Sequence, residues 1–157
     1  MINSHEWKEM RPSDDPHWEQ YIKTRLEIFD DHSLVIDLSR PIPPESLVAL
    51  RDRGIGPTFA VLTACNPHGV VASEAANQHF SQLLELEVND GGWIHVRADG
   101  VSPDAQHRER GLAVAMPKAD ALAFARKYGQ SAFYWFDGAS MWIVGALVAT
   151  PDIRLPA

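Results

Sequence analysis

Short apolar runs alternate along the chain with segments whose apolar positions recur every three or four residues. The short runs are typical of buried strands, which we expect at residues 33–38, 59–62, 93–97, 112–116, 132–136 and 141–148. The wider spacing is typical of amphipathic helices, which we expect at residues 13–29, 45–53, 73–89 and 117–128. The first helix would bury Trp18, Tyr21, Ile22, Leu26 and Phe29.

The order of these elements, α-β-α-β-α-β-β-α-β-β, predicts an α/β chain of mixed α+β type. Helices would pack on one mainly antiparallel sheet. Residues 59–62 and 112–116 are apolar on both faces, which indicates interior strands. Asp137-Gly138 predicts a hairpin between the last two strands, and residues 98–106 predict a loop. We expect a single domain over residues 1–157, with a loose arm at residues 1–12.

Composition narrows the class of protein. The chain has 157 residues, of which 45% are hydrophobic, as in ordinary globular proteins. Its net charge of −7 argues against nucleic acid as a partner, because phosphate binding requires clustered lysine and arginine. No apolar stretch is long enough to span a membrane. The single cysteine, Cys65, excludes an internal disulfide and fits a reducing compartment, so we expect a cytoplasmic protein without membrane partners.

The most informative segment follows the strand at residues 59–62. That strand ends in the polar sequence Thr63-Ala64-Cys65-Asn66-Pro67, where Asn-Pro breaks regular structure. A helix start, Ser73-Glu74-Ala75-Ala76-Asn77, comes shortly afterwards. A strand, a polar elbow and a helix N-terminus commonly build a ligand site in proteins of this class.

Four blocks of the sequence share an order and spacing with a known family. They are the strand ending at Thr63–Pro67, Ser73-x-x-x-Asn77, Glu109 ahead of residues 112–116, and Tyr128-Gly129-Gln130 ahead of the next strand. In these blocks the chain resembles the family called domain of unknown function 3293, over roughly residues 17–148. The resemblance implies a fold and a set of polar positions, and it implies no established activity.

Five polar residues lie at the ends of the predicted elements: Thr63, Asn66, Asn77, Glu109 and Gln130. Such groups converge where strands end and helices begin. We therefore expect a site for a small polar ligand, either a metabolite or a nucleotide-like molecule, with Asn66, Asn77, Glu109 and Gln130 in one cleft. If the protein is an enzyme, Glu109 is the candidate acid or base, and Thr63, Asn66, Asn77 and Gln130 bind the ligand.

The same residues also fit a second class of protein, one that is not an enzyme. In a non-enzymatic interaction or regulatory module, the same polar side chains would only hold the elbow and the helix start in place. The hairpin at residues 132–148 would then offer an edge to a partner or to a second copy of the chain. A pocket lined by several of the five side chains favours ligand binding, whereas side chains satisfied by local backbone favour the module.

Cys65 and the histidines raise two further hypotheses. Cys65-x-x-His68 has the spacing of a metal-ligand pair, but His79, His95 and His107 are isolated and form no second pair. Cys65 could also act as a nucleophile, although a lone cysteine after an apolar strand is most often a small buried hydrophobe. We expect no metal and no cofactor, and we expect Ser73 to be a plain helix N-cap.

Overall fold

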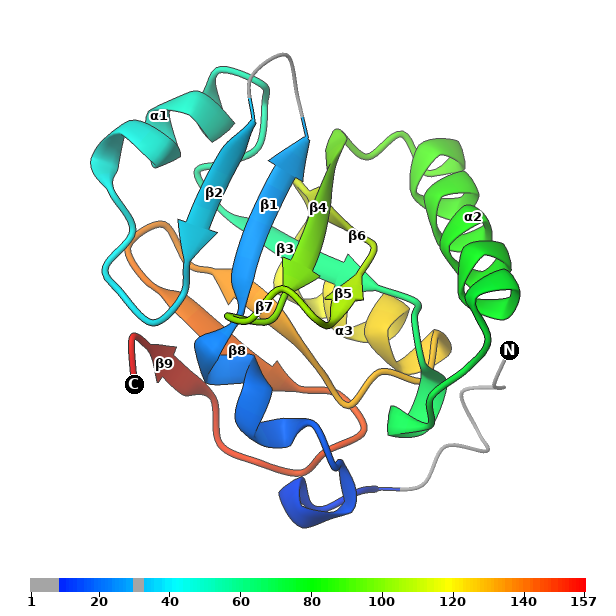
Figure 1. The fold of residues 1–157 in the computed structure, drawn as a ribbon. Coiled ribbons are helices and arrows are strands. Elements are labelled where there is room, and N and C mark those ends of the chain that lie inside the picture. The colour runs from blue at the N-terminus through cyan, green and yellow to red at the C-terminus, as the bar shows by residue number, and fades with distance from the viewer. Residues whose placement is uncertain (1–8, 30–32) are drawn as a thin grey trace.

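The computed structural model describes residues 9–29 and 33–157, and it combines nine strands with three α-helices (Figure 1). The strands are β1 (Arg25–Phe29), β2 (Leu34–Asp37), β3 (Phe59–Thr63), β4 (His95–Val101), β5 (Arg108–Glu109), β6 (Gly111–Val114), β7 (Ala132–Phe136), β8 (Met141–Gly145) and β9 (Ile153–Leu155). The α-helices are α1 (Pro44–Arg51), α2 (Glu74–Asp90) and α3 (Lys118–Lys127), and the short 3-10 helices are η1 (Pro12–Asp14), η2 (Trp18–Lys23) and η3 (Pro67–Gly69).

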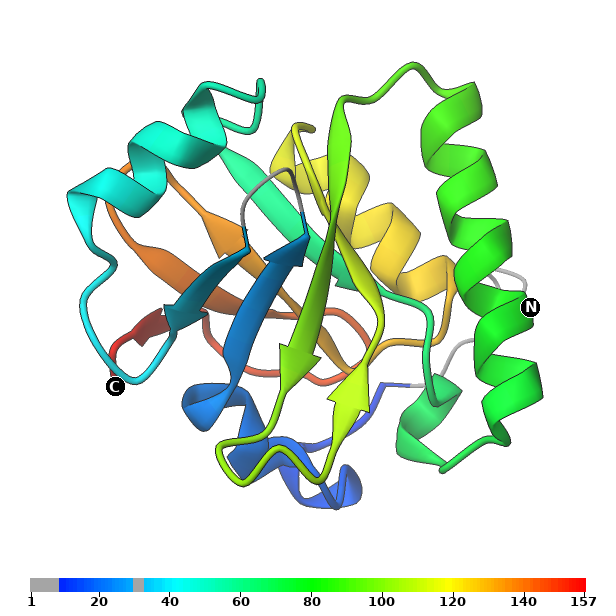
Figure 2. The same ribbon diagram turned by 45° about the horizontal axis from the view of Figure 1, so that its top comes forward.

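All nine strands join one antiparallel sheet. Its order is β2-β1-β4-β6-β3-β7-β8-β9, and the short strand β5 pairs with β4 beside this path. Ile36 of β2 and Leu155 of β9, from opposite ends of that order, belong to the same buried cluster. The sheet is therefore strongly curled, as Figure 2 shows.

The curled sheet separates two hydrophobic cores. Helices α2 and α3 cover its outer face, where Leu84 and Ala125 pack with Leu62 and Leu112. The inner face encloses the second core, which α1 closes with Leu50 and to which η2 contributes Trp18, Tyr21 and Ile22. The mixed α+β class and the mainly antiparallel sheet predicted from the sequence are confirmed, with a sheet larger than expected.

The interior strands were predicted correctly. Strand β3 lies between β6 and β7, and β6 lies between β4 and β3. Both strands are covered on both faces, which explains their apolar sequences. The hairpin at Asp137-Gly138 is also confirmed, and its two tryptophans, Trp135 and Trp142, form a direct cross-strand pair. Ser73 caps α2, with its hydroxyl accepting a hydrogen bond from the Ala76 backbone N–H at 3.1 Å.

The helix predicted at residues 13–29 is wrong. Its first part forms the 3-10 helices η1 and η2, and its last part forms strand β1. Leu26 and Ile28 face the core two residues apart because they pair with Gly100 and Ala98 of β4. Phe29, expected in the core, is 40% exposed, and the guanidinium of Arg97 lies 4.6 Å from its ring centre. The local spacing of apolar residues fits either a helix or a strand, and pairing with the distant strand β4 decides in favour of the strand.

The loop predicted at residues 98–106 is also wrong in its first half. Strand β4 continues to Val101, and the fully buried Asp99 is held by Arg97 at 2.9 Å and by Arg108 at 3.0 Å. These ion pairs allow an aspartate within a strand, where the sequence alone suggested a turn. The sequence analysis missed strands β1, β5 and β9. Each forms through pairing with a strand that is distant in sequence, and β5 and β9 are only two and three residues long.

The sequence analysis predicted that the hairpin at residues 132–148 could offer an exposed edge to a partner, and the strand order tests whether that hairpin lies at an edge. The hairpin β7–β8 lies between β3 and β9, so its strands are interior, and β9 is the edge strand on that side of the sheet. Met10 binds the chain near the C-terminus, donating to Leu147 O at 2.6 Å and accepting from Ala149 N at 2.8 Å. The rest of the predicted arm up to residue 8 lies outside the described residues, and the single-domain assignment stays a prediction. No helix among the described residues is long and apolar enough to cross a membrane.

Candidate functional site

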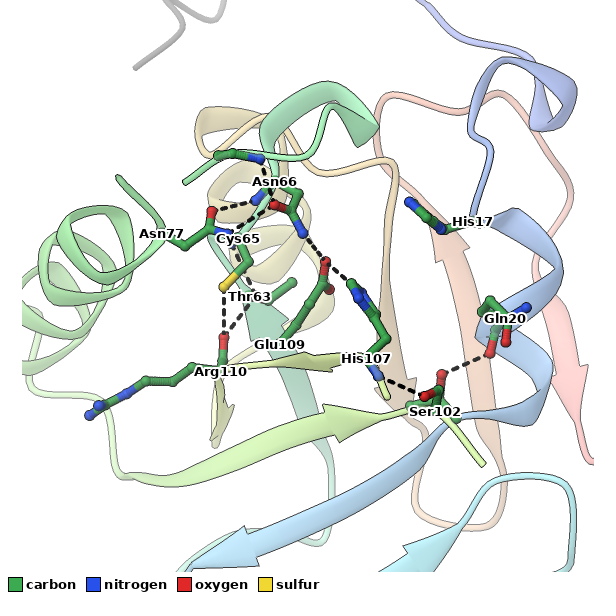
Figure 3. A network of polar contacts seen from close by, with 12 residues as sticks. His17, Gln20, Thr63, Cys65, Asn66, Asn77, Ser102, His107, Glu109 and Arg110 are labelled. Atoms are coloured by element: carbon green, nitrogen blue, oxygen red, sulfur yellow. Dashed lines mark hydrogen bonds and ion pairs between the residues drawn. The ribbon is translucent and has the colours of Figure 1, made fainter. Parts of the chain in front are cut away.

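A cavity of about 90 Å³ lies on the inner face of the sheet, where β3 and β4 end and β1, β6 and β7 begin. This volume is well above the roughly 10–15 Å³ that one water molecule requires by the same measure. Its polar lining includes Asp15, His17, Gln20, Tyr21, Thr63, Asn66, Ser102, His107, Glu109, Gln130 and Ser131. Figure 3 shows the side of the cavity formed by the elbow after β3 and by strand β5. Four of the five predicted site residues line this one cavity.

Asn66 is the centre of the polar network at the elbow (Figure 3). Its Nδ2 donates to Glu109 Oε1 at 2.9 Å, and its Oδ1 accepts from Asn77 Nδ2 at 2.9 Å and from Ala72 N at 3.0 Å. Its backbone N–H donates to Asn77 Oδ1 at 2.8 Å. Its φ of 49° is left-handed, a conformation that asparagine tolerates better than most residues. The Asn-Pro elbow therefore orients a side chain toward the carboxylate of β5.

Thr63 and Asn77 hold this network together. The Thr63 hydroxyl donates to the Arg110 carbonyl at 2.8 Å and accepts from the Cys65 N–H at 3.1 Å, which ties the end of β3 to the chain after β5. Asn77 does not line the cavity, and its amide forms two hydrogen bonds with Asn66. Both side chains are already satisfied by the protein, so their geometry fits a positioning role.

The side chain of Glu109 lies on the opposite face of the sheet from those of Arg108 and Arg110, its neighbours in the sequence. Arg108 and Arg110, one residue to either side, pair with carboxylates away from the cavity: Arg108 with Glu27 and Asp99, and Arg110 with Glu85. Side chains alternate along a strand, so Glu109 alone of the three lines the cavity.

A histidine lies beside the Glu109 carboxylate. Glu109 Oε1 is 3.6 Å from His107 Nε2. Hydrogen bonding to Glu109 raises the pKa of His107 above its ordinary value, although partial burial opposes the shift. The His107 ring also stacks on His17, with ring centres 5.5 Å apart. Glu109 therefore has an amide donor on one side and a basic imidazole on the other.

Gln130 is the most deeply buried of the predicted site residues, at 5% exposure. Its Nε2 donates to the backbone carbonyls of Cys65 and Tyr128, each at 3.0 Å. These two acceptors fix the orientation of the amide, because its oxygen could not take the place of the nitrogen. Its Oε1 accepts no hydrogen bond from the described residues, and it is the part of the amide left for the cavity.

Sequence analysis missed the wall of the cavity that comes from residues 15–24. Asp15 is only 5% exposed, and Tyr21 lies with its ring centre 5.9 Å from that of Tyr134. Burial raises the pKa of Tyr21 well above its ordinary value, and the negative charges of Asp15 and Glu109 add to the shift. The sequence analysis assigned Asp15 to the start of a helix and Tyr21 to the core face of the same helix. Because Ser13-Asp14-Asp15-Pro16 also has the pattern of a helix start, no local signal pointed to a cavity wall here.

Cys65 has the surroundings of a structural residue. Its sulfur lies 3.7 Å from Ser81 Oγ and 3.6 Å from the Arg110 carbonyl oxygen. Burial raises the pKa of the Cys65 thiol, which disfavours the thiolate that a nucleophile or a metal ligand requires. Within the described ranges, no group of three or more His, Cys, Asp or Glu side chains could hold a metal ion.

The fold and the cavity define an α+β protein whose curled antiparallel sheet encloses a cavity lined in part by polar side chains. Residues 62–133 match the model of a family described as Protein of unknown function (DUF3293), which confirms, over that segment, the resemblance inferred from the sequence. The matched segment runs from the end of β3 to the start of β7 and contains all five predicted site residues. Searches of curated proteins and of solved structures found no match.

Proposed function

We propose that this protein binds a small polar molecule, such as a metabolite or a nucleotide-like compound, in the cavity beneath η2. One observation carries the proposal. Gln130 and Asp15 both line the cavity and are both 5% exposed, yet Gln130 Oε1 accepts no hydrogen bond from the described residues. Leaving a buried polar group unsatisfied costs about 1–3 kcal/mol, and a ligand with complementary groups would offset that cost.

The contacts favour ligand binding over a purely structural cluster. A structural cluster would satisfy every polar side chain within the protein, as happens at Thr63 and Asn77. Glu109 and Gln130 depart from that pattern, since each retains an oxygen without a hydrogen bond from the described residues. A purely structural role, as expected in an interaction module, therefore explains only part of this polar network.

If the protein catalyses a reaction, Glu109 is our candidate for the general acid or base. Asn66 Nδ2 fixes one carboxylate oxygen, while the second is available to a bound molecule. His107, 3.6 Å from the first oxygen, could exchange protons between that carboxylate and solvent, because its side chain is 45% exposed. Gln130 would orient the substrate.

A thermal-shift screen against nucleotides, amino acids and common metabolites tests the proposal. A ligand at a hundred times its dissociation constant adds about 2.7 kcal/mol of stability. For a chain of this length that corresponds to a rise in Tm of about 5–10 °C. Backbone amide shifts of Gln130 to Ala132 in NMR spectra would locate each hit in the cavity. A complete screen without any hit at these amides would contradict the proposal.

Two variants then separate binding from catalysis. Glu109→Gln keeps the shape of the side chain and removes its charge, so an acid–base role predicts lost turnover with retained binding. Glu85→Gln is the matched control, because Glu85 pairs with Arg110 away from the cavity and its loss should leave turnover unchanged. Unchanged turnover in Glu109→Gln would leave only a binding function.

Location and assembly belong to the same proposal. A cytoplasmic location is supported by the single cysteine, which fits a reducing compartment. Self-association, if it occurs, would use the sheet edge at β9 and not the interior hairpin that precedes it. Sedimentation of the purified chain over a range of concentrations would measure it.

A further inference from the structure

We propose that the molecule bound in this cavity is a small organic cation, whose ammonium or guanidinium N–H groups donate hydrogen bonds to Asp15, Glu109 and Gln130. This inference rests on the proposed function and names the chemical class of its ligand. It follows from three independent features of the cavity: the charges of its lining, the unsatisfied hydrogen-bonding atoms, and the aromatic wall.

The charged lining of the cavity is predominantly negative. Asp15 and Glu109 supply two carboxylates, and none of the described residues in the lining is lysine or arginine. The nearest arginines in sequence, Arg108 and Arg110, are paired elsewhere with Glu27, Asp99 and Glu85. The basic side chains of the lining are His17 and His107, and His107 already faces Glu109. Opposite charge therefore favours a cation and disfavours phosphate or carboxylate ligands.

Two buried oxygens in the lining, one on Asp15 and one on Gln130, are acceptors left without partners among the described residues. Asp15 accepts one hydrogen bond, from the His17 N–H to Oδ1 at 2.8 Å, and its second oxygen accepts none from the described residues. Gln130 uses both N–H groups of its amide on backbone carbonyls and leaves Oε1. Both residues are 5% exposed, so little of either side chain is open to bulk solvent. A ligand that satisfies them must supply hydrogen-bond donors, and charged donors form the strongest such bonds with carboxylates.

The aromatic wall is compatible with the same class of ligand. Tyr21 and Tyr134 line the cavity side by side, and aromatic faces attract organic cations. Burial raises the pKa of Tyr134, as it does that of Tyr21, so both phenols stay neutral. The Tyr134 hydroxyl donates to the Tyr21 carbonyl oxygen at 2.7 Å, so its proton is not free to bind an anion.

Four probes with one carbon skeleton test the inference: n-butylamine, n-butylguanidine, 1-butanol and butyrate. Each is titrated into the ¹⁵N-labelled protein at pH 7, and dissociation constants are obtained from the amide shifts of Gly100 and of Gln130 to Ala132. We expect the two cations to bind at least about tenfold more tightly than 1-butanol, and butyrate to bind more weakly still.

Two variants identify the groups responsible. Asp15→Asn keeps an oxygen for the His17 N–H but removes the charge, and it should weaken both cations about tenfold while leaving 1-butanol unchanged. Glu85→Gln removes a carboxylate outside the cavity and should change none of the four constants.

The outcomes separate this inference from the proposed function. Equal or tighter binding of 1-butanol or butyrate, or no effect of Asp15→Asn on the cations, would overturn the cationic ligand while the cavity remained a binding site. If none of the four probes shifts the cavity amides, the cationic ligand is wrong. The metabolite screen then decides whether a neutral or anionic molecule binds there, or whether the cavity binds none.

Discussion

Asn66 donates a hydrogen bond from Nδ2 to Oε1 of Glu109 across 2.9 Å, joining two residues that are 43 positions apart in the sequence. Asn66 lies on the elbow after β3, whereas Glu109 lies on β5 at the margin of the sheet. The bond brings the elbow, the start of α2 and strand β5 into one network, because Asn66 also binds Asn77 and Ala72. The carboxylate is therefore oriented by the protein before any ligand arrives.

Replacing Asn66 should destabilise the fold through two separable effects. Asn66→Ala removes the partners of Glu109, Asn77 and Ala72 and forces alanine into a left-handed conformation, so we expect a loss of about 2–4 kcal/mol. Asn66→Gly loses the same bonds without the backbone strain and should be about 1 kcal/mol more stable than Asn66→Ala. Chemical denaturation of both variants measures the difference. Equal stabilities would show that the conformation at residue 66 carries no strain.

The His107–Glu109 contact should appear in the pH dependence. Because Glu109 raises the pKa of His107 in the folded protein, the pair stabilises the fold fully below the unfolded pKa of about 6.5. That stabilisation is lost as pH rises through the raised, folded pKa. NMR titration of His107 should give a pKa above about 6.5 in the parent protein and a lower value in Glu109→Gln. A His107 pKa that does not change in Glu109→Gln would contradict the assignment.

Gln130 should contribute to stability as well as to the cavity. Gln130→Met preserves approximate volume but leaves the carbonyls of Cys65 and Tyr128 without their side-chain donor. We expect a loss of about 1–3 kcal/mol, measured by urea denaturation. Gln20→Met is the control, since Gln20 lines the cavity but is exposed, and it should change stability by less than about 0.5 kcal/mol. Similar losses in both variants would refute the role assigned to the Gln130 amide.

Cys65 should react slowly and be replaceable. Its raised pKa and 5% exposure predict that iodoacetamide modifies it at least about tenfold more slowly in the native protein than in urea. Cys65→Ser should leave the dissociation constant of any ligand found in the screen within a few fold, since the thiol makes only long contacts with Ser81 and the Arg110 carbonyl. Complete loss of binding or activity with the fold intact would reveal a chemical role for the thiol.

Gly111 should be far less tolerant of a methyl group than a glycine on the neighbouring strand. A Cβ at Gly111 would lie 2.5 Å from Leu62 O and 2.8 Å from Ala98 O, which are backbone atoms of the two flanking strands. Gly111→Ala should therefore cost more than about 3 kcal/mol. At Gly100 the nearest atom is Thr24 Cγ2 at 3.5 Å, so Gly100→Ala should remain within about 1 kcal/mol of the parent. Calorimetry on both variants compares them directly.

Several elements could be predicted because their determinants are local. The apolar runs of β3 and β6, the Asp137-Gly138 turn and the Ser73 cap each fix a structure within a few residues. The polar elbow could be predicted for the same reason, since Asn66-Pro67 ends the strand by itself. Thr63, Asn66, Glu109 and Gln130 line one cavity because the ends of neighbouring elements lie close together, whereas Asn77 lies outside the lining and binds Asn66.

Only the tertiary structure decided which further groups surround the cavity. Residues 13–29 carry a spacing that suits a helix, but pairing of β1 with β4 draws Leu26 and Ile28 into a strand and leaves Asp15 and Tyr21 in the same cavity lining as Glu109. Strand β5 exists only because β4 pairs with it, and that pairing turns Glu109 inward and its flanking arginines outward. A strand that short takes its hydrogen bonds and its facing from a partner distant in sequence, so its side chains have no direction until the sheet has formed.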